Sequence, residues 1–276
     1  NCFKEYRVVK TGLKHGTVTV IIDYCPIEIT TFRKDGAYSD HRRPDRVEFV
    51  GSLREDLSRR DFTINAMAYN VKKGLKDYFG GKSDLERGLI RCVGNAEKRI
   101  QEDALRILRA LRFASVFSFD ICNETSEAIY SKKHLLAGIS RERISGELGR
   151  LICGEGAKKI LRLYIDVIAV LIPELKAFKD EKRAVSDLWE HTLESVDAAP
   201  ADMVIRLALL LHNTAKLICD DKTEVSGEYT EKIADTAEAV LRRMRYDNKT
   251  LSSVKKLVMY YDLEINPEIA VVKSLL

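Results

Sequence analysis

Residues 102–113, EDALRILRALRF, place one aspartate and three arginines at a constant interval. Side chains that are three residues apart lie on the same side of an α-helix, with a small rotation around the axis from each to the next. Leu105, Leu108 and Leu111 form a parallel apolar stripe that would hold such a helix against a core. The polar series is either an ion-paired solvent ridge or a set of hydrogen-bonding groups that face a ligand. Its members are Asp103, Arg106, Arg109 and Arg112.

A second polar cluster lies in RRDFTINAMAYN, residues 59–70. One capping residue is enough to start a helix, whereas this stretch crowds two arginines, an aspartate and an asparagine together. Guanidinium groups donate in a planar fork that suits phosphate oxygens, and a carboxylate or amide suits sugar hydroxyls. The cluster is therefore either a capped, ion-paired helix start or a binding site for a nucleoside triphosphate. The candidate binding residues are Arg60, Asp61 and Asn65.

The composition is that of a globular protein. The chain has 276 residues, of which 45% are hydrophobic and 32% charged, so it has room for more than one domain. A formal net charge of +4 permits a nucleic-acid partner without requiring one. The six cysteines are far apart and form no C-x-x-C pair, which predicts reduced thiols rather than disulfides or a zinc site.

The sequence contains no recognisable targeting signal. No apolar run reaches the length of a membrane span and no signal-peptide pattern opens the chain, so we expect a cytoplasmic protein without a membrane partner. The sequence begins without an initiator methionine and ends inside an apparent helix. We therefore expect an internal part of a longer protein.

The first third of the chain carries strand patterns. Residues 16–22 and 27–32 are rich in β-branched side chains and are separated by a turn, so we predict a two-stranded antiparallel hairpin. Beyond it we predict a polar loop at 33–46, one helix through 56–70, a glycine-rich turn at 79–88 and a short strand at 89–93.

Helical periodicity takes over from Asn95, and no strand pattern is recognisable beyond it. One helical segment is predicted over residues 95–117, with further helices after it. The predicted fold class is α+β, with antiparallel strands and helices first and an all-helical region after them. The predicted domains are a head at 1–94, a neck at 95–155 and a body at 156–276.

Six motifs between Gly12 and Ala114 occur in the order and at the approximate spacing of one family. They are GLKHGTVTV, IEITTFR, SDHRRPDRVEFV, LSRRDFTINAMAYN, DYFGGKSDLERGLIRCVG and EDALRILRALRFA. In these motifs the sequence resembles the class II tRNA nucleotidyltransferases, which comprise the CCA-adding enzymes and related bacterial poly(A) polymerases. The resemblance implies a partial nucleotidyltransferase head, a helical neck that reads the incoming base, and a helical body.

The resemblance also implies which residues bind the nucleotide. Arg60 would contact it, with Asp61 and Asn65 beside it. Arg109 and Arg112 would face the triphosphate.

Asp103 and Arg106 would act as a protein template. Aspartate accepts a hydrogen bond from the exocyclic amino group that cytosine and adenine share, and arginine donates to the neighbouring ring nitrogen or carbonyl. The implied reaction is template-independent addition of CMP and AMP, from CTP and ATP, to the 3′ end of tRNA.

Glu28 has two interpretations. A glutamate between two isoleucines on a strand is commonly the solvent-facing position of an alternating pattern. The resemblance makes it instead a third carboxylate near two metal-binding aspartates. The family's glycine-rich phosphate motif and its Asp-x-Asp do not occur in this sequence. We therefore expect Mg²⁺ to require an intact head, no metal ligands in this chain, and no catalysis by this chain alone.

GGKS at residues 80–83 resembles the end of a P-loop, but the glycine required upstream falls at Lys76. We therefore predict a turn before a helix rather than a phosphate loop.

LALLLHNTAKL resembles part of the HD motif of metal-dependent phosphohydrolases. His191 and His212 would be two ligands of such a site, but Asn213 stands at the expected aspartate and Tyr261 at a further histidine. A neutral amide is a poor metal ligand beside a carboxylate, so we predict an HD-like body without a metal.

Several alternatives to CCA addition stay open at this point. Within the same reaction class they are a poly(A) polymerase or an enzyme that adds only part of the CCA end. Outside it they are an HD phosphohydrolase and a catalytically inactive RNA-binding fragment. A two-stranded hairpin with an exposed edge also predicts a homodimer.

Overall fold

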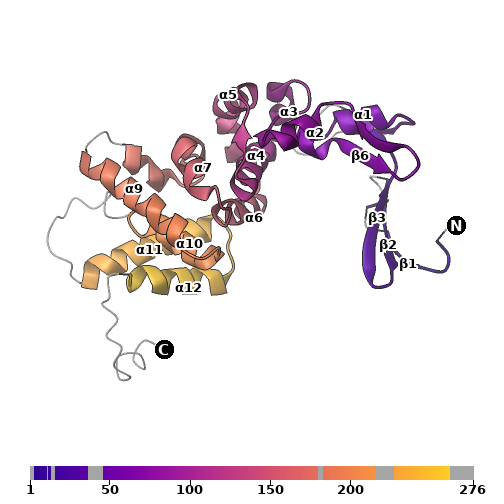
Figure 1. Cartoon of the computed structure of the whole chain (residues 1–276). Helices are drawn as coiled ribbons and strands as arrows, with labels where there is room; N and C mark the ends of the chain where they lie inside the picture. Colours follow the sequence, from indigo (N-terminus) through magenta and orange to yellow (C-terminus); the bar gives the residue numbers. More distant parts are fainter. Residues whose placement is uncertain are drawn as a thin grey trace. The chain divides into compact units, whose positions relative to one another are not determined.

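A computed structural model describes residues 3–10, 12–13, 16–36, 46–179, 183–214 and 227–261 (Figure 1). The chain divides into two compact units. The first contains Asn1–Ala110 and Phe119–Leu135, and the second contains Leu111–Ser118 and Leu136–Leu276. Small antiparallel sheets precede a mostly helical remainder, so the predicted α+β class is confirmed.

The first unit begins with a three-stranded antiparallel sheet in the order β1-β2-β3. β2 (Thr17–Ile22) and β3 (Cys25–Thr30) form the predicted hairpin. Asp23 and Tyr24 connect them with φ values of 47° and 62°, as a two-residue type I′ turn requires. The prediction of only two strands is wrong, because β1 (Arg7–Val9) pairs with the other edge of β2.

The single helix predicted over residues 56–70 is also wrong. α1 (Leu53–Ser58), capped by the Ser52 hydroxyl, ends before the two arginines. Phe62 is extended instead, and residues 63 and 61 pair with residues 91 and 93 through backbone hydrogen bonds of 2.9 and 3.0 Å. Pairing with a distant segment thus overrides the local helical pattern.

A 3-10 turn (Thr63–Asn65) leads into a second hairpin, formed by β6 (Met67–Asn70) and β7 (Gly74–Asp77). The glycine-rich turn predicted over residues 79–88 is wrong for most of that range, because α2 (Gly81–Glu86) lies within it. A Cβ on Gly81 would come within 2.1 Å of the Thr63 carbonyl oxygen, so only glycine fits there. The GGKS stretch is therefore the N-cap and first turn of α2, and the prediction that it is a turn before a helix is wrong.

One short strand lies beyond Asn95, which the sequence did not predict. β9 (Asp120–Ile121) pairs in parallel with β8 (Leu89–Ile90). Strands of two residues are too short for a period-two pattern to be recognised. The remaining elements of the first unit are β4 (Arg33–Asp35), β5 (Val47–Phe49), α3 (Ala96–Glu102) and α5 (Asn123–Lys132).

The helical segment predicted over residues 95–117 is broken at Asp103. α3 ends at Glu102, and α4 (Leu105–Phe117) begins after two further residues. The Asp103 backbone is extended, at φ −141° and ψ 102°, and its Oδ1 accepts from the Leu105 amide at 3.1 Å. An aspartate that bonds to a nearby backbone amide favours a helix boundary over a helix interior.

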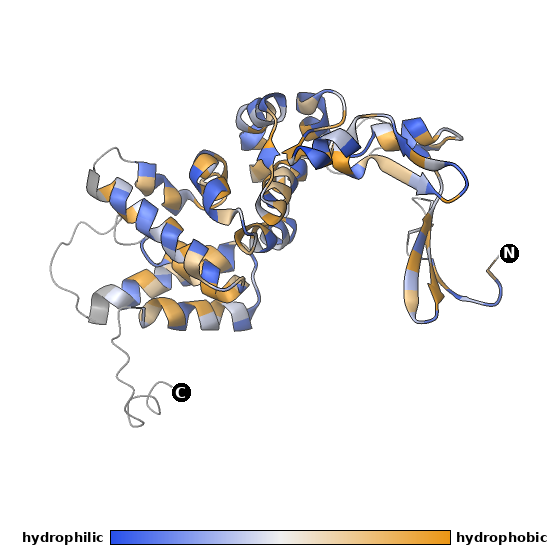
Figure 2. Ribbon diagram, viewed as in Figure 1, coloured by the Kyte–Doolittle hydropathy of each residue, from blue (hydrophilic) through white to orange (hydrophobic). Residues whose placement is uncertain are grey.

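The second unit is helical throughout its described residues. Its core consists of apolar faces of α6, α9, α10, α11 and α12, including Leu148, Leu193, Leu210, Val240 and Val254 (Figure 2). No helix in the described part of the chain is long and apolar enough to span a bilayer. Besides the C-terminal part of α4, the elements are η3 (Lys133–Gly138, shared with the first unit), α6 (Arg141–Ile152), α7 (Ala157–Leu163), α8 (Ile165–Ile168), η4 (Pro173–Lys179), α9 (Arg183–Ala198), α10 (Met203–Leu211), α11 (Gly227–Arg243) and α12 (Asn248–Met259).

Candidate nucleotide-binding site

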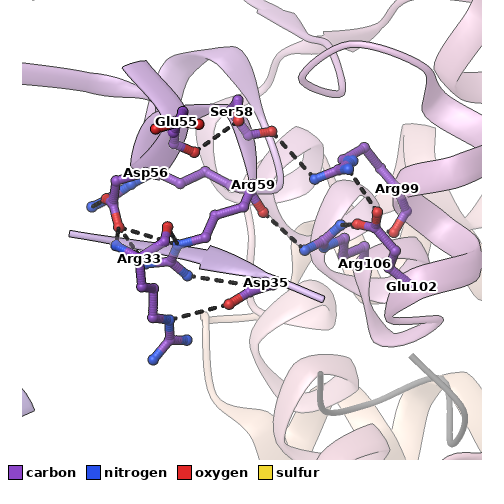
Figure 3. Close-up of polar contacts among 10 residues, drawn as sticks. Arg33, Asp35, Glu55, Asp56, Ser58, Arg59, Arg99, Glu102 and Arg106 are labelled. Carbon is purple, nitrogen blue, oxygen red and sulfur yellow. Dashed lines mark hydrogen bonds and ion pairs between the residues drawn. The ribbon is translucent and has the colours of Figure 1, made fainter. Parts of the chain in front are cut away.

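Asp56, in α1, is a buried anchor for the arginine-rich loop that follows the helix. Its Oδ1 accepts from the Arg33 amide at 3.1 Å and from Arg59 Nε and Nη2 at 3.1 and 2.8 Å (Figure 3). Burial disfavours the charged carboxylate, but the Arg59 hydrogen bond and the Arg33 amide outweigh it and hold the pKa of Asp56 below its usual value. Arg59 also lies 3.5 Å from Asp35, so this arginine joins α1 to β4.

Arg60 is more accessible than Arg59. Its side chain is 45% exposed, against 18% for Arg59. Nη1 donates to the Asn65 carbonyl at 3.3 Å, and Nη2 lies 3.6 Å from Asp56. Of the two adjacent arginines, Arg60 is therefore the one whose guanidinium can reach a ligand.

Asp61 links the loop to α4. Its Oδ2 accepts from Arg109 Nε at 2.8 Å and from Nη2 at 2.6 Å, and its Oδ1 accepts from the Phe62 amide and from Asn65 Nδ2 at 2.9 and 3.3 Å. Both carboxylate oxygens are engaged, so Asp61 and Asn65 orient Arg109. The structure thus brings together Arg60, Asp61, Asn65 and Arg109 from the two polar clusters.

Arg106 is held tightly in the first unit. It is 8% exposed, and its Nη1 donates to Glu102 Oε2 at 2.9 Å and to the Arg99 carbonyl at 2.8 Å. Its Nη2 donates to the Arg59 carbonyl at 3.1 Å (Figure 3). Of the five N–H donors of the Arg106 guanidinium, the one on Nε and one of the two on Nη2 take no part in these three bonds.

Glu102 is a residue that the sequence analysis missed. It accepts from Arg106 and also from Arg99 Nη2 at 2.6 Å, while Arg99 Nη1 donates to the Ser58 carbonyl at 3.2 Å. The two arginines thereby cap carbonyls at the C-terminal end of α1. The i,i+4 spacing of Glu102 and Arg106 is the sequence pattern that could have identified the pair.

Asp103 precedes α4 rather than lying on it. Its carboxylate is half-buried and caps the start of the helix, and the Arg106 amide donates to its carbonyl at 2.9 Å. The expectation that Asp103 and the arginines share one continuous helical face is therefore wrong for the aspartate, although Asp103 and Arg106 both stand at the start of α4.

Arg112 belongs to the second unit. Its Nε lies 3.0 Å from Glu147 Oε2, and the two side chains are only 12% and 10% exposed. Its guanidinium carbon lies 4.1 Å from the centroid of the Phe113 ring. Within this unit Arg112 is part of a largely buried ion pair.

The described residues do not fit a divalent metal ion. They contain no group of three or more His, Cys, Asp or Glu side chains that could hold one. Glu28 is exposed on β3, directly opposite Thr19. No step through a metal ion is therefore derived from these residues.

The HD-like cluster assembles in the second unit. The His212 ring lies 5.8 Å from His191 and 5.0 Å from Tyr261, measured between centroids. Asn213 is buried and its Nδ2 donates to Thr192 Oγ1 at 3.0 Å. The residues that stand at the metal-ligand positions of the HD motif thus lie together in the fold.

Comparison with known proteins identifies the family. Residues 1–91 match the model of the poly(A) polymerase head domain, and residues 118–179 match the model described as the probable RNA- and SrmB-binding site of polymerase A. The CCA-adding enzyme of Lactobacillus johnsonii is 47% identical over 176 residues, which are 64% of this chain and 44% of that enzyme. The chain belongs to the family of class II CCA-adding enzymes and poly(A) polymerases.

Solved structures of CCA-adding enzymes share the fold. The crystal structure of the Bacillus stearothermophilus CCA-adding enzyme in complex with CTP matches with a TM-score of 0.65 and 30% identity, over 98% of this chain and 60% of that one. A tRNA nucleotidyltransferase complexed with a primer tRNA and an incoming ATP analog matches with a TM-score of 0.59 and 25% identity, over 94% of this chain and 70% of that one. The chain thus spans less than two thirds of the length of the Lactobacillus johnsonii and Bacillus stearothermophilus enzymes.

Proposed function

We propose that the protein containing this chain adds CMP and AMP to the 3′ end of tRNA without a nucleic-acid template. The observation that carries this proposal is the position of Asp103 and Arg106 at the start of α4. Arg106 is fixed by Glu102 and two backbone carbonyls, so its remaining donors have a defined direction. A preorganised donor beside a carboxylate acceptor suits the edges of cytosine and adenine. The relatives solved with CTP and with a primer tRNA support this substrate class.

In this proposal the loop after α1 and the helix α4 bind the triphosphate. Arg60 contacts the nucleotide directly, and Asp61 with Asn65 holds Arg109 in position. Arg112 is a further phosphate contact that shares its guanidinium with Glu147. Phosphates are common to all nucleotides, so these arginines supply affinity and not base selectivity.

Catalysis is expected to need residues outside this sequence. Glu28 is the carboxylate that we propose for the catalytic centre, and the resemblance implies Mg²⁺ as cofactor. The sequence contains no Asp-x-Asp. We therefore propose that the 276-residue chain binds nucleotide but transfers none of it.

The experiment compares the natural protein with the 276-residue chain. Each is incubated with radiolabelled CTP or ATP and a tRNA that lacks its CCA end. Ordered incorporation of C, C and A by the natural protein supports CCA addition, whereas a long A tract identifies a poly(A) polymerase. Incorporation by the 276-residue chain would contradict the proposal that it is inactive alone.

A further inference from the structure

The β6–β7 hairpin has a tip that is held by its own hydrogen bonds. Asn70 Oδ1 accepts from the amides of Lys72 and Lys73 at 2.9 and 3.3 Å, and the Asn70 carbonyl accepts from the Lys73 amide at 3.1 Å. Gly74 closes the turn with φ +67°, a value that glycine adopts without strain. The tip is therefore preorganised by local contacts.

This rigid hairpin presents apolar and cationic side chains together. Tyr69 is 72% exposed and Val71 89% exposed, and Tyr69 lies directly opposite Leu75 in the sheet register. Cross-strand partners point to the same face, so the tyrosine ring and Leu75 form one apolar patch. Exposed lysines stand at positions 72 and 73 in the turn beside this patch, and Lys76, the neighbour of Leu75 on β7, is exposed on the opposite face of the hairpin.

The carboxylate of the hairpin stands at the end of β7 that is far from the tip. Within the described residues, the side chains of these three lysines form no ion pair with a carboxylate. Asp77, the acidic residue of the hairpin, accepts from the amides of Phe79, Gly81 and Lys82. Burial disfavours the Asp77 carboxylate, but those amide donors outweigh it and lower its pKa. Asp77 therefore stays ionised, and three lysines against this one carboxylate give the hairpin a net positive charge.

Single exposed aromatic residues are ordinary on protein surfaces. A tyrosine, two aliphatic side chains and three lysines on one preorganised hairpin form a more specific combination. Lysines attract phosphates, and an exposed ring stacks on an unpaired base of any identity. We propose that the β6–β7 hairpin is an RNA-binding surface on which Lys72 and Lys73 contact phosphates and Tyr69 stacks on a base. The identity of this RNA as tRNA rests on the proposed function.

The test measures binding of a tRNA that lacks its CCA end to the 276-residue chain at several salt concentrations. Lys72→Ala with Lys73→Ala should lower affinity about tenfold and reduce the slope of log affinity against log salt by about 1.4, or ~0.7 for each lost contact. Tyr69→Ala should lower affinity roughly tenfold with little change in slope, and Tyr69→Phe should retain binding. CTP binding, measured in parallel, should be unchanged in all of them.

Lys249→Ala with Lys256→Ala, on α12, is the matched control because it removes the same charge from exposed positions of the second unit. A loss in this control as large as in the hairpin variant would overturn the inference, since net charge alone would explain it. Unchanged tRNA affinity in both hairpin variants would overturn it while leaving the proposed function intact. Failure of the unaltered chain to bind tRNA, with CTP binding retained, would refute the inference and separate it from nucleotide recognition.

Discussion

Asp61 Oδ2 accepts two hydrogen bonds from Arg109, at 2.8 Å from Nε and 2.6 Å from Nη2. The pair joins the loop after α1 to α4 across 48 positions of sequence. It holds the Arg109 guanidinium in one orientation and leaves Nη1 outside these two bonds. Asp61 is therefore a positioning residue for Arg109 in our proposal.

This pair leads to a prediction about affinity. Arg109→Ala should weaken the binding of CTP and ATP equally, by about tenfold, because a charge-assisted hydrogen bond is worth roughly 1.5–3 kcal/mol and phosphates carry no base identity. Asp61→Asn should cause part of the same loss. The double variant should be no weaker than Arg109→Ala alone, because the two residues act as one unit. Calorimetric titration measures all three, and a strong shift in the preference for CTP over ATP would contradict the assignment.

Parts of this site could be predicted from sequence because they depend on local spacing. The Leu105, Leu108 and Leu111 stripe is buried as expected, and the hairpin across Asp23 and Tyr24 forms with the expected strands. The assignment of Arg60 to the nucleotide comes from the resemblance of its motif to the family, and it stays a prediction.

Other parts depend on partners that are distant in sequence. Phe62 is extended because its neighbours pair with residues 91 and 93, and no local pattern encodes that partner. Asp103 was placed on a helix because apolar periodicity continues across it, whereas its side chain caps the next helix. Asp56 was overlooked because its importance comes from burial beside Arg59 and the Arg33 amide, which only the fold determines.

Base selectivity should depend on Asp103. Asp103→Asn exchanges an acceptor oxygen for a donor amide, so discrimination of CTP and ATP against UTP and GTP should fall by roughly 1–3 kcal/mol. Competition binding with the four triphosphates measures this. Asp187→Asn, an exposed position on α9, is the control for the loss of one negative charge. Selectivity that survives in Asp103→Asn would refute the protein-template assignment.

The role of Arg106 needs a different choice of variants, because this residue also stabilises the fold. Arg106→Ala would remove the donor that Arg106 supplies to Glu102 Oε2 and to the Arg59 carbonyl, so it should lower both stability and selectivity. Glu102→Gln keeps an oxygen acceptor but removes the charge that orients Arg106. We expect this variant to fold and to lose part of the selectivity, with affinity for the triphosphate nearly unchanged. Equal losses for all four nucleotides would show that Glu102 has only a structural role.

Arg112 is predicted to affect stability more than Arg109 does. Removing one member of its largely buried pair with Glu147 should cost about 3 kcal/mol of unfolding free energy. Urea denaturation of Arg112→Ala measures this cost, and nucleotide titration of the same variant measures its share in phosphate binding. Glu147→Gln is the matched control, because it should lower stability without lowering nucleotide affinity. Equal nucleotide affinity in wild type and Arg112→Ala would remove Arg112 from the binding site.

The HD-like cluster is predicted to hold no divalent metal tightly. Asn213 stands where a carboxylate would be needed. The His212 ring lies beside His191 and Tyr261, and neither of these two side chains is a carboxylate. Elemental analysis of the purified chain should find no stoichiometric zinc, manganese or iron. A chelator should leave its melting temperature unchanged. One metal ion per chain that is lost from His191→Ala and His212→Ala would contradict this.

Asp56 should make the free energy of unfolding of the first unit depend on pH in the acidic range. Its pKa is lower in the folded chain than in the unfolded chain, where it is about 3.9. The ionised carboxylate therefore stabilises the fold above that unfolded value, and the contribution is lost as the pH falls through the folded value. Asp56→Asn should lower the unfolding free energy by about 3 kcal/mol at pH 7, because it removes the buried charge that accepts two hydrogen bonds from Arg59.

The difference in stability between wild type and Asp56→Asn should be constant from pH 7 to pH 5 and should shrink below about pH 4. Amide hydrogen exchange across residues 53–63 reports the stability of this unit directly. Glu55→Gln, an exposed neighbour on the same helix, is the control for loss of a carboxylate without loss of a buried ion pair. Because Asp56 holds Arg59 and lies beside Arg60, its loss should also weaken CTP and ATP binding at pH 7. A difference in stability that stays constant down to pH 3 would show that ionised Asp56 does not stabilise the fold.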